Sequence, residues 1–245
     1  MPRPVLLIAG GSRGIGAATA RLAGKRGYDV AVNYKTNSNA AASVVKAVEK
    51  VGGKAVAIQG DMALESDIER VFDTAADTFG SLTHFVHSSG IIGEASRLDE
   101  VSPKTIREVL EVDTFGALLC LRACMRRMST RHGGNGGAVV MLSSMAAPLG
   151  GANECVWYAA AKAGVDSMVI GASREVAKEG IRINAVTPGV IETDIQPPGR
   201  VERLLPMLPM GRAGQADEVA EAVLFLLSDG ASYINGANLR VSGAR

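Results

Sequence analysis

The sequence contains few of the residues from which disulfides and metal sites are built. Only three cysteines and three histidines occur among its 245 residues. Cys120 and Cys124 lie four apart in a helical pattern and Cys155 follows far downstream, so the paired spacing of zinc ligands is missing. The histidines also lack an HExxH arrangement; they are His84, His87 and His132. We interpret the cysteines as reduced packing residues and predict no metal site.

An excess of charge of one sign is also missing, because 26 Lys and Arg residues nearly balance 25 Asp and Glu residues. Such a chain has no net field that would attract nucleic acid or an anionic membrane. The apolar run 5–9 reaches glycines too early for a signal peptide, and no later run approaches about 18 apolar residues. We therefore predict a cytoplasmic protein with neither nucleic acid nor membrane as a partner.

Short apolar segments alternate with longer helical patterns along the chain. The predicted strands are 5–9, 29–34, 54–59, 84–87, 138–142, 181–186 and 237–241. The predicted helices are 14–26, 38–51, 65–79, 103–131, 156–179 and 216–227. This alternation indicates βαβ units and a parallel sheet covered on both faces. We predict one α/β domain over residues 1–245, a doubly wound Rossmann-type fold with a seven-stranded parallel sheet and helices on both faces.

The stretch 190–214 interrupts this alternation. It carries prolines and, between them, large apolar residues: Pro197, Pro198, Pro206 and Pro209, with Leu204, Leu205, Met207, Leu208 and Met210. Such a stretch is typical of a mobile lid over a binding site. Its arginines could contact an anionic substrate or only solvent; they are Arg200, Arg203 and Arg212.

A glycine-rich loop follows the first predicted strand and leads into an alanine-rich helix. Its glycines let the backbone turn tightly and approach a ligand, and N–H groups at the helix start suit a pyrophosphate. Glycines also occur in tight turns for steric reasons alone, but the position in the first βαβ unit favours dinucleotide binding. The loop residues assigned to this contact are Gly10, Ser12, Arg13, Gly14, Ile15 and Gly16.

The end of the second predicted strand helps to distinguish NADP from NAD. An acidic residue there hydrogen-bonds the ribose diol and repels a 2′-phosphate, whereas this chain has Asn33, Tyr34 and Lys35. Arg13 and Lys35 could flank a 2′-phosphate through charge-assisted hydrogen bonds. Isolated Lys and Arg residues are otherwise usually solvated. We predict NADP as the cofactor, with NAD less favoured.

Tyr158 and Lys162 lie four apart in a helical pattern and therefore share one helix face. A nearby cation favours the phenolate form of tyrosine, whose ordinary pKa is about 10, and so prepares it for acid–base chemistry. Ser144 follows a predicted parallel strand, at the edge where ligands bind, and its hydroxyl can hold a substrate oxygen. Separately, these residues are common in structural roles. Their combination with the glycine loop favours catalysis.

In the order of these motifs the chain resembles the short-chain dehydrogenase/reductase family over residues 5–243, with the greatest likeness to bacterial 3-oxoacyl-acyl-carrier-protein reductases and sugar dehydrogenases. Further matching residues are Asp61 and Met62, then Pro188, Gly189, Ile191 and Thr193. The resemblance implies that Tyr158 is the acid–base residue and that Lys162 contacts the nicotinamide ribose. It also implies that Asp61 contacts adenine and that the matching residues from 188 to 193 hold the nicotinamide.

Three features depart from the family pattern at this edge of the sheet. Ala9 replaces a threonine whose hydroxyl usually ties the glycine loop to the fourth strand. The usual Asn-Asn-Ala-Gly is here His87, Ser88, Ser89 and Gly90, and we expect the last three to line a rebuilt cofactor site. Asp113 replaces an asparagine that positions a water beside the lysine. It could accept from that water or pair with Lys162, and we count it among the catalytic residues.

The sequence therefore predicts an NADP(H)-dependent oxidoreductase that transfers hydride between nicotinamide and a small carbonyl or secondary alcohol. One alternative is a dinucleotide-binding regulatory or scaffold protein that has lost turnover, and another is a structural homo-oligomer without a ligand. The resemblance and the patterns 103–131 and 156–179 predict a homotetramer. The substrate itself is not predicted, because this catalytic set serves enzymes acting on sugars, steroids, ketones and acyl thioesters.

Overall fold

A seven-stranded parallel sheet forms the centre of the computed structural model, which describes residues 3–245. Its strand order is β3-β2-β1-β4-β5-β6-β7, and each neighbouring pair is parallel. The strands are β1 (Val5–Ala9), β2 (Asp29–Tyr34), β3 (Ala55–Gln59), β4 (His84–His87), β5 (Gly137–Leu142), β6 (Ile181–Pro188) and β7 (Asn238–Val241). The sheet confirms the predicted fold class.

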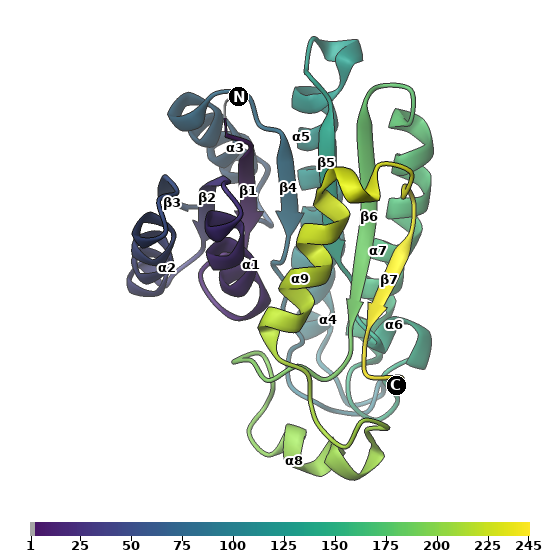
Figure 1. The fold of residues 1–245 in the computed structure, drawn as a ribbon. Helices are drawn as coiled ribbons and strands as arrows, with labels where there is room; N and C mark the ends of the chain where they lie inside the picture. The colour runs from purple at the N-terminus through teal and green to yellow at the C-terminus, as the bar shows by residue number, and fades with distance from the viewer. Residues whose placement is uncertain (1–2) are drawn as a thin grey trace.

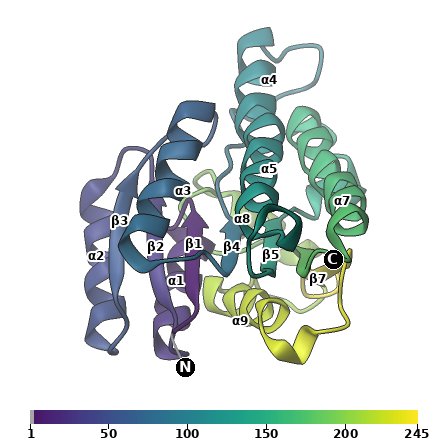
Figure 2. The same ribbon diagram turned by 90° about the horizontal axis from the view of Figure 1, so that it is seen from above.

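Helices cover both faces of the sheet (Figures 1 and 2). One face carries α1 (Gly14–Lys25), α2 (Ser38–Lys50) and α9 (Ala216–Leu227), and the other carries α3 (Glu65–Phe79), α5 (Gly116–Met128) and α7 (Val156–Val176). Successive strand side chains point to opposite faces, so Leu7 packs in one apolar cluster while Leu6 and Ile8 pack in the other. This two-sided burial explains why β1 is apolar at every position.

The strand order reverses at β1. The next two strands in the sequence, β2 and β3, lie on one side of β1, and β4 to β7 lie on the other side. Ligands bind at such a switch point, outside the carboxyl ends of the strands. The loops after β1 and β4 meet there, because Ser88 N–H donates to the Ala9 carbonyl at 2.9 Å. A Cβ added to Gly10 would lie 2.8 Å from the Ser89 nitrogen, so only glycine allows this approach. In Figure 1 the strand arrows end at the lower edge, near α4 (Pro103–Leu110), α6 (Ala146–Leu149) and α8 (Arg200–Leu204).

The helix predicted over 103–131 is present as far as Met128, but it is not a regular α-helix throughout. The structure has α4, then a π-helical turn at Glu111–Phe115, then α5, which ends at Met128. The wider turn ends at Gly116, where an added Cβ would lie 2.0 Å from the Met62 carbonyl oxygen. Single π-helical turns within α-helices often occur at functional sites. This one carries the buried Asp113.

Other boundaries shift by a few residues, as expected for frayed ends. The helix predicted over 156–179 ends at Val176, and the strand predicted over 181–186 continues to Pro188. The sequence pattern does not predict the short helices α6 and α8.

The stretch 190–214 is closed at its base by a bridge between Ile191 and Gly214. It has a small core of its own, formed by Val190, Leu204, Leu208 and Ala213.

Candidate active site

Two adjoining pockets open at the carboxyl edge of the sheet. The inner pocket is lined by Ser144, Tyr158 and Lys162 and by residues of the 188–196 segment. The outer pocket is lined by the glycine loop, the end of β2 and Asp61 with Met62. The two pockets share Ile15, Ser88, Ser89, Gly90, Thr193 and Ile195. The structure thus brings the predicted site residues to one continuous cleft, except Gly16 and Asp113, which line neither pocket.

The glycine loop is anchored by the side chain of Asn33. Its Oδ1 accepts from Gly10 N–H at 3.1 Å, and its Nδ2 donates to the Gly60 carbonyl at 3.0 Å. Asn33 is buried, so its amide supports the loop, although the residue lines the outer pocket. This bond connects the loop to β2 and gives it a support that does not depend on a hydroxyl at Ala9.

The loop fits the pyrophosphate of a dinucleotide. Gly16 packs so tightly that an added Cβ would lie 2.3 Å from the Gly10 carbonyl oxygen. Helix α1 begins at Gly14, and the N-cap residue Arg13 makes no side-chain capping bond. The first N–H groups of a helix lack partners within the helix and carry partial positive charge, so they can bind an anion.

The two cations considered for a 2′-phosphate differ in their surroundings. Lys35 Nζ lies 2.6 Å from Asp61 Oδ2, in an ion pair whose lysine end is 62% exposed. Arg13 is exposed at the opening of the outer pocket, and it forms no ion pair within residues 3–245. Lys35 would therefore be shared between Asp61 and a 2′-phosphate, whereas Arg13 is available to bind the phosphate alone.

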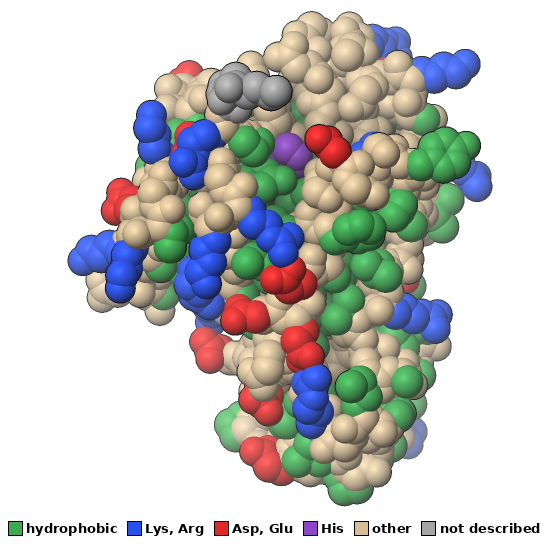
Figure 3. Space-filling view, in the orientation of Figure 1, with side chains coloured by type: hydrophobic (Ala, Val, Ile, Leu, Met, Phe, Trp, Pro, Cys, Tyr) green, Lys and Arg blue, Asp and Glu red, His purple; other side chains and the backbone are tan. Residues whose placement is uncertain are grey.

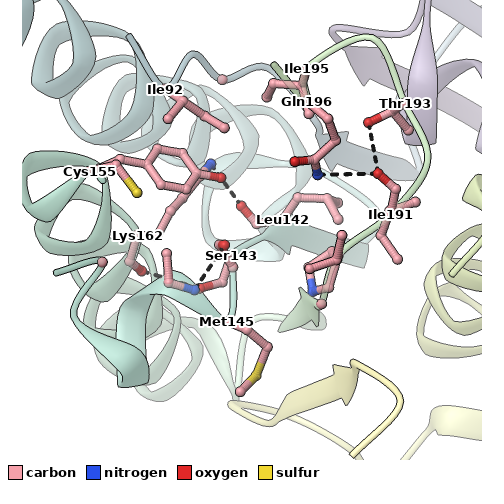
Figure 4. A pocket seen from close by; sticks show the side chains of 18 of the residues that line it. Ile92, Leu142, Ser143, Met145, Cys155, Lys162, Ile191, Thr193, Ile195 and Gln196 are labelled. Carbon is pink, nitrogen blue, oxygen red and sulfur yellow. Dashed lines mark hydrogen bonds between the residues drawn. The ribbon is translucent and has the colours of Figure 1, made fainter. Parts of the chain in front are cut away.

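Tyr158 and Lys162 lie one turn apart on α7, and Ser144 lies just beyond the end of β5. Ser144 hydrogen-bonds the phenol of Tyr158. Lys162 Nζ lies 5.6 Å from the centre of the tyrosine ring and donates to the Leu142 carbonyl at 3.1 Å. Figure 4 shows Lys162 and Cys155 on one side of the inner pocket, facing Ile195 and Gln196 across it.

Asp113 pairs directly with Lys162, as one of the two roles considered for it requires. Its Oδ2 lies 3.2 Å from Lys162 Nζ, and its Oδ1 accepts from Ile91 N–H at 2.8 Å. Both side chains are almost completely buried. Removing one partner of such a pair would leave a buried charge without compensation.

Burial raises the pKa of Tyr158 above its ordinary value. Lys162 and the Ser144 hydrogen bond oppose this shift, while the nearby Asp113 carboxylate adds to it. Burial alone would lower the pKa of Lys162, but Asp113 and Tyr158 outweigh it and the lysine pKa is raised. The lysine acts in the predicted direction, yet the net shift of the tyrosine is opposite to the one that the sequence suggested. At neutral pH the phenol therefore keeps its proton.

His87 occupies the position of the first family asparagine and is completely buried on β4. Neither ring nitrogen has a hydrogen-bond partner among the described residues. Burial, reinforced by the charge of Lys162, lowers the pKa of His87 to about 3. The imidazole is therefore neutral at physiological pH and adds no charge beside the Asp113–Lys162 pair.

The sequence did not identify several residues that complete the inner pocket. They are Ile92, Leu149, Glu154, Cys155, Ile195 and Gln196. They belong to loops or to the short helix α6, where no periodic pattern marks them. The lid arginines, whose partners the sequence left open, each pair with a carboxylate: Arg200 and Arg203 with Glu154, and Arg212 with Glu218.

Basic and acidic side chains are both scattered over the face that carries α1 and α9, among uncharged side chains (Figure 3). Within residues 3–245 no three His, Cys, Asp or Glu side chains are grouped as metal ligands would be. In the same part of the chain, no helix has the length and apolar character needed to cross a bilayer.

Comparison with known proteins gives a consistent picture. A family model described as enoyl-(acyl carrier protein) reductase matches residues 9–243. The chain is 41% identical to the uncharacterized oxidoreductase YgfF of Escherichia coli (strain K12), with 98% of this chain and 99% of that protein covered. It is 37% identical to cis-4-hydroxycyclohexanecarboxylate dehydrogenase of Sinomonas cyclohexanicum, covering 98% and 95%. The crystal structure of levodione reductase superimposes with a TM-score of 0.91 at 28% identity, covering 99% and 97%.

Proposed function

The chain belongs to the short-chain dehydrogenase/reductase family of oxidoreductases, and we propose that it is an NADPH-dependent carbonyl reductase. One observation supports this proposal most strongly. The hydroxyls of Ser144 and Tyr158 face a pocket that is continuous with the cleft of the glycine loop. A carbonyl held by these hydroxyls would therefore lie beside the end of a dinucleotide bound along the loop.

NADPH supplies the hydride when it is bound. The glycine loop and the start of α1 would hold its pyrophosphate, Asp61 its adenine end, and Pro188, Gly189, Ile191 and Thr193 its nicotinamide end. Ser144 holds the carbonyl oxygen, and the protonated phenol of Tyr158 donates its proton to that oxygen as the carbonyl carbon accepts hydride. Lys162 stabilises the resulting phenolate, and Asp113 holds the ammonium in place. The product is a secondary alcohol.

Cyclic ketones of moderate size are the proposed substrates. The relative from Sinomonas cyclohexanicum is a cis-4-hydroxycyclohexanecarboxylate dehydrogenase, and a 36% identical relative from Acinetobacter is a cyclohexanol dehydrogenase. The apolar wall formed by Ile92, Leu149 and Ile195 suits a hydrocarbon ring. We propose that the stretch 190–214, which supplies Ile195 to this wall, acts as a lid over the bound substrate.

A screen of carbonyl compounds that follows NADPH absorbance tests the proposed activity. We expect turnover of cyclic ketones. Binding of the dinucleotide without turnover across the panel would favour the regulatory or scaffold alternative. If no dinucleotide raised the melting temperature, the ligand-free alternative would gain support.

We predict that the protein binds NADPH more tightly than NADH. Arg13→Ala should weaken NADPH binding by about tenfold or more, because charge-assisted hydrogen bonds contribute roughly 1.5–3 kcal/mol. Lys35→Ala should weaken NADPH binding less, because the Lys35 ammonium already forms an ion pair with Asp61. Titration of both cofactors into each variant measures this, and NADH affinity is the internal control because NADH lacks the 2′-phosphate. Equal or tighter NADH binding, or an unchanged NADPH affinity in the double variant, would disprove the preference.

We propose a homotetramer in which the α4–α5 face packs against a second copy. Leu110, Phe115 and Leu118 are exposed on this face beside the polar residues Arg107 and Glu111, and symmetric oligomers bury such faces. Light scattering should give four times the 25.4 kDa chain mass. The Phe115→Glu/Leu118→Glu variant should give a smaller species. A monomeric mass for the unaltered protein would contradict the proposal.

A further inference from the structure

Glu154 binds two arginines at the rim of the inner pocket. Arg200 donates through Nη2 to Glu154 Oε2 at 2.9 Å and through Nη1 to Gln196 Oε1 at 2.6 Å. Arg203 donates to the other carboxylate oxygen, Oε1. Two cations thus share one anion. The group has a net charge of +1.

The carboxylate stays ionised in this arrangement. Burial alone would raise the pKa of Glu154, but the hydrogen bonds and charges of Arg200 and Arg203 outweigh it and lower the pKa. A guanidinium has five N–H donors, and Arg200 uses only two of its nitrogens within the described chain, one for each bond. Its side chain is 19% exposed. Arg200 therefore has N–H groups that can still donate hydrogen bonds, although its guanidinium is largely shielded from water.

Arg200 lines the same pocket as Ser144 and Tyr158, whereas Arg203 does not. The remaining wall is largely apolar and includes Ile92, Leu149 and Cys155. The pocket therefore combines a carbonyl-binding pair, an apolar surface and an incompletely neutralised guanidinium. A molecule that matches all three has a ketone, a hydrocarbon body and an anionic group.

We propose that the inner pocket selects keto acids, with the substrate carboxylate bound by Arg200. This specificity rests on the proposed carbonyl reductase function. A planar guanidinium binds a carboxylate through two parallel hydrogen bonds, which a lysine cannot reproduce. Glu154 opposes binding by its negative charge, while it also holds Arg200 in place. The alternative role of this group is only to attach α8 to the loop before α7, and in that role a substitution of Arg200 would affect the acid and its ester equally.

The test compares keto acids with their methyl esters, including 4-oxocyclohexanecarboxylate and its ester, as substrates with NADPH. The ester has the same ring and ketone but no charge. We expect kcat/KM to be about 10- to 100-fold higher for the acid than for the ester, because a hydrogen bond to a charged group contributes that much. The preference should appear mainly in KM.

Arg200→Gln should bring the acid-to-ester ratio of kcat/KM close to one, and Arg200→Lys should retain part of the preference. The matched control is Arg203→Gln, which removes the other cation from Glu154 and should keep the ratio. Both substrates are measured on one preparation, so partial unfolding of a variant cancels in the ratio.

Three outcomes would count against keto acid selection. Esters reduced as well as acids by the unaltered protein would overturn it and leave the carbonyl reductase function intact. An acid-to-ester ratio that Arg200→Gln leaves unchanged would assign the group to attachment of α8 alone. If none of these ketones were reduced while NADPH bound, the proposed function would fail together with the inference.

Discussion

Tyr158→Phe should lower turnover of a ketone by about 10²- to 10⁴-fold, the usual contribution of a positioned general acid. The substitution removes only the phenolic oxygen, which Ser144 hydrogen-bonds and from which the carbonyl oxygen would receive its proton. Ring packing beside Lys162 is retained. NADPH affinity should therefore change little, and kcat from the decay of NADPH absorbance gives the effect.

A second tyrosine provides a matched control for this substitution. Tyr28 is as buried as Tyr158, at 8% exposure. It immediately precedes β2, at the opposite edge of the sheet from the cleft. Tyr28→Phe should leave kcat unchanged. Turnover of Tyr158→Phe at the rate of the unaltered protein would show that another group supplies the proton.

The protein should lose about 4 kcal/mol of its unfolding free energy through two histidines as the pH falls from 7 to 5. Burial lowers the pKa of His87 to about 3 and that of His84 to about 4. Both rings are neutral when folded, whereas in the unfolded chain they bind protons near pH 6.5. Their contribution is therefore fully present above pH 6.5 and is lost as the pH falls toward 4 and 3. Each accounts for about 2 kcal/mol of this loss.

His87→Asn isolates one of these contributions. The variant carries the residue that the family usually has here, and it cannot titrate. Urea unfolding at pH 7 and at pH 5 gives the unfolding free energy that each protein loses over this pH range. The variant should lose about 2 kcal/mol less than the unaltered protein. Comparing the change with pH removes any constant effect of repacking. The same pH dependence in both proteins would mean that His87 is already protonated, or accessible to water, in the folded state.

The fold could be read from the sequence because its signals are local and repeated. Segments such as Val5–Ala9 and His84–His87 are the strands that were predicted, and the motif residues end at one sheet edge because parallel strands share an orientation. The family resemblance also identified Tyr158 and Lys162, which the structure places on one helix face beside the pocket.

What could not be predicted depends on contacts between distant parts of the chain. No residue pattern marks the π-helical turn at Glu111–Phe115, which lies where Gly116 packs closely against the Met62 carbonyl oxygen. The position of Asn33 predicts a cofactor contact, but it does not reveal that the Asn33 amide also bonds the glycine loop. The ion pair of Glu154 with Arg200 joins residues 46 apart, and neither carries a motif.

Hydride transfer to a carbonyl carbon is the central claim, and transfer of deuterium from labelled NADPH measures it directly. A ketone reduced by the protein is incubated with NADPH that carries deuterium at C4 of the nicotinamide, in either of the two stereochemical positions. The product alcohol, examined by mass spectrometry and NMR, should carry a single deuterium on its carbinol carbon from one labelled form and none from the other. An alcohol without deuterium from both forms, or bound cofactor with no alcohol formed, would contradict it.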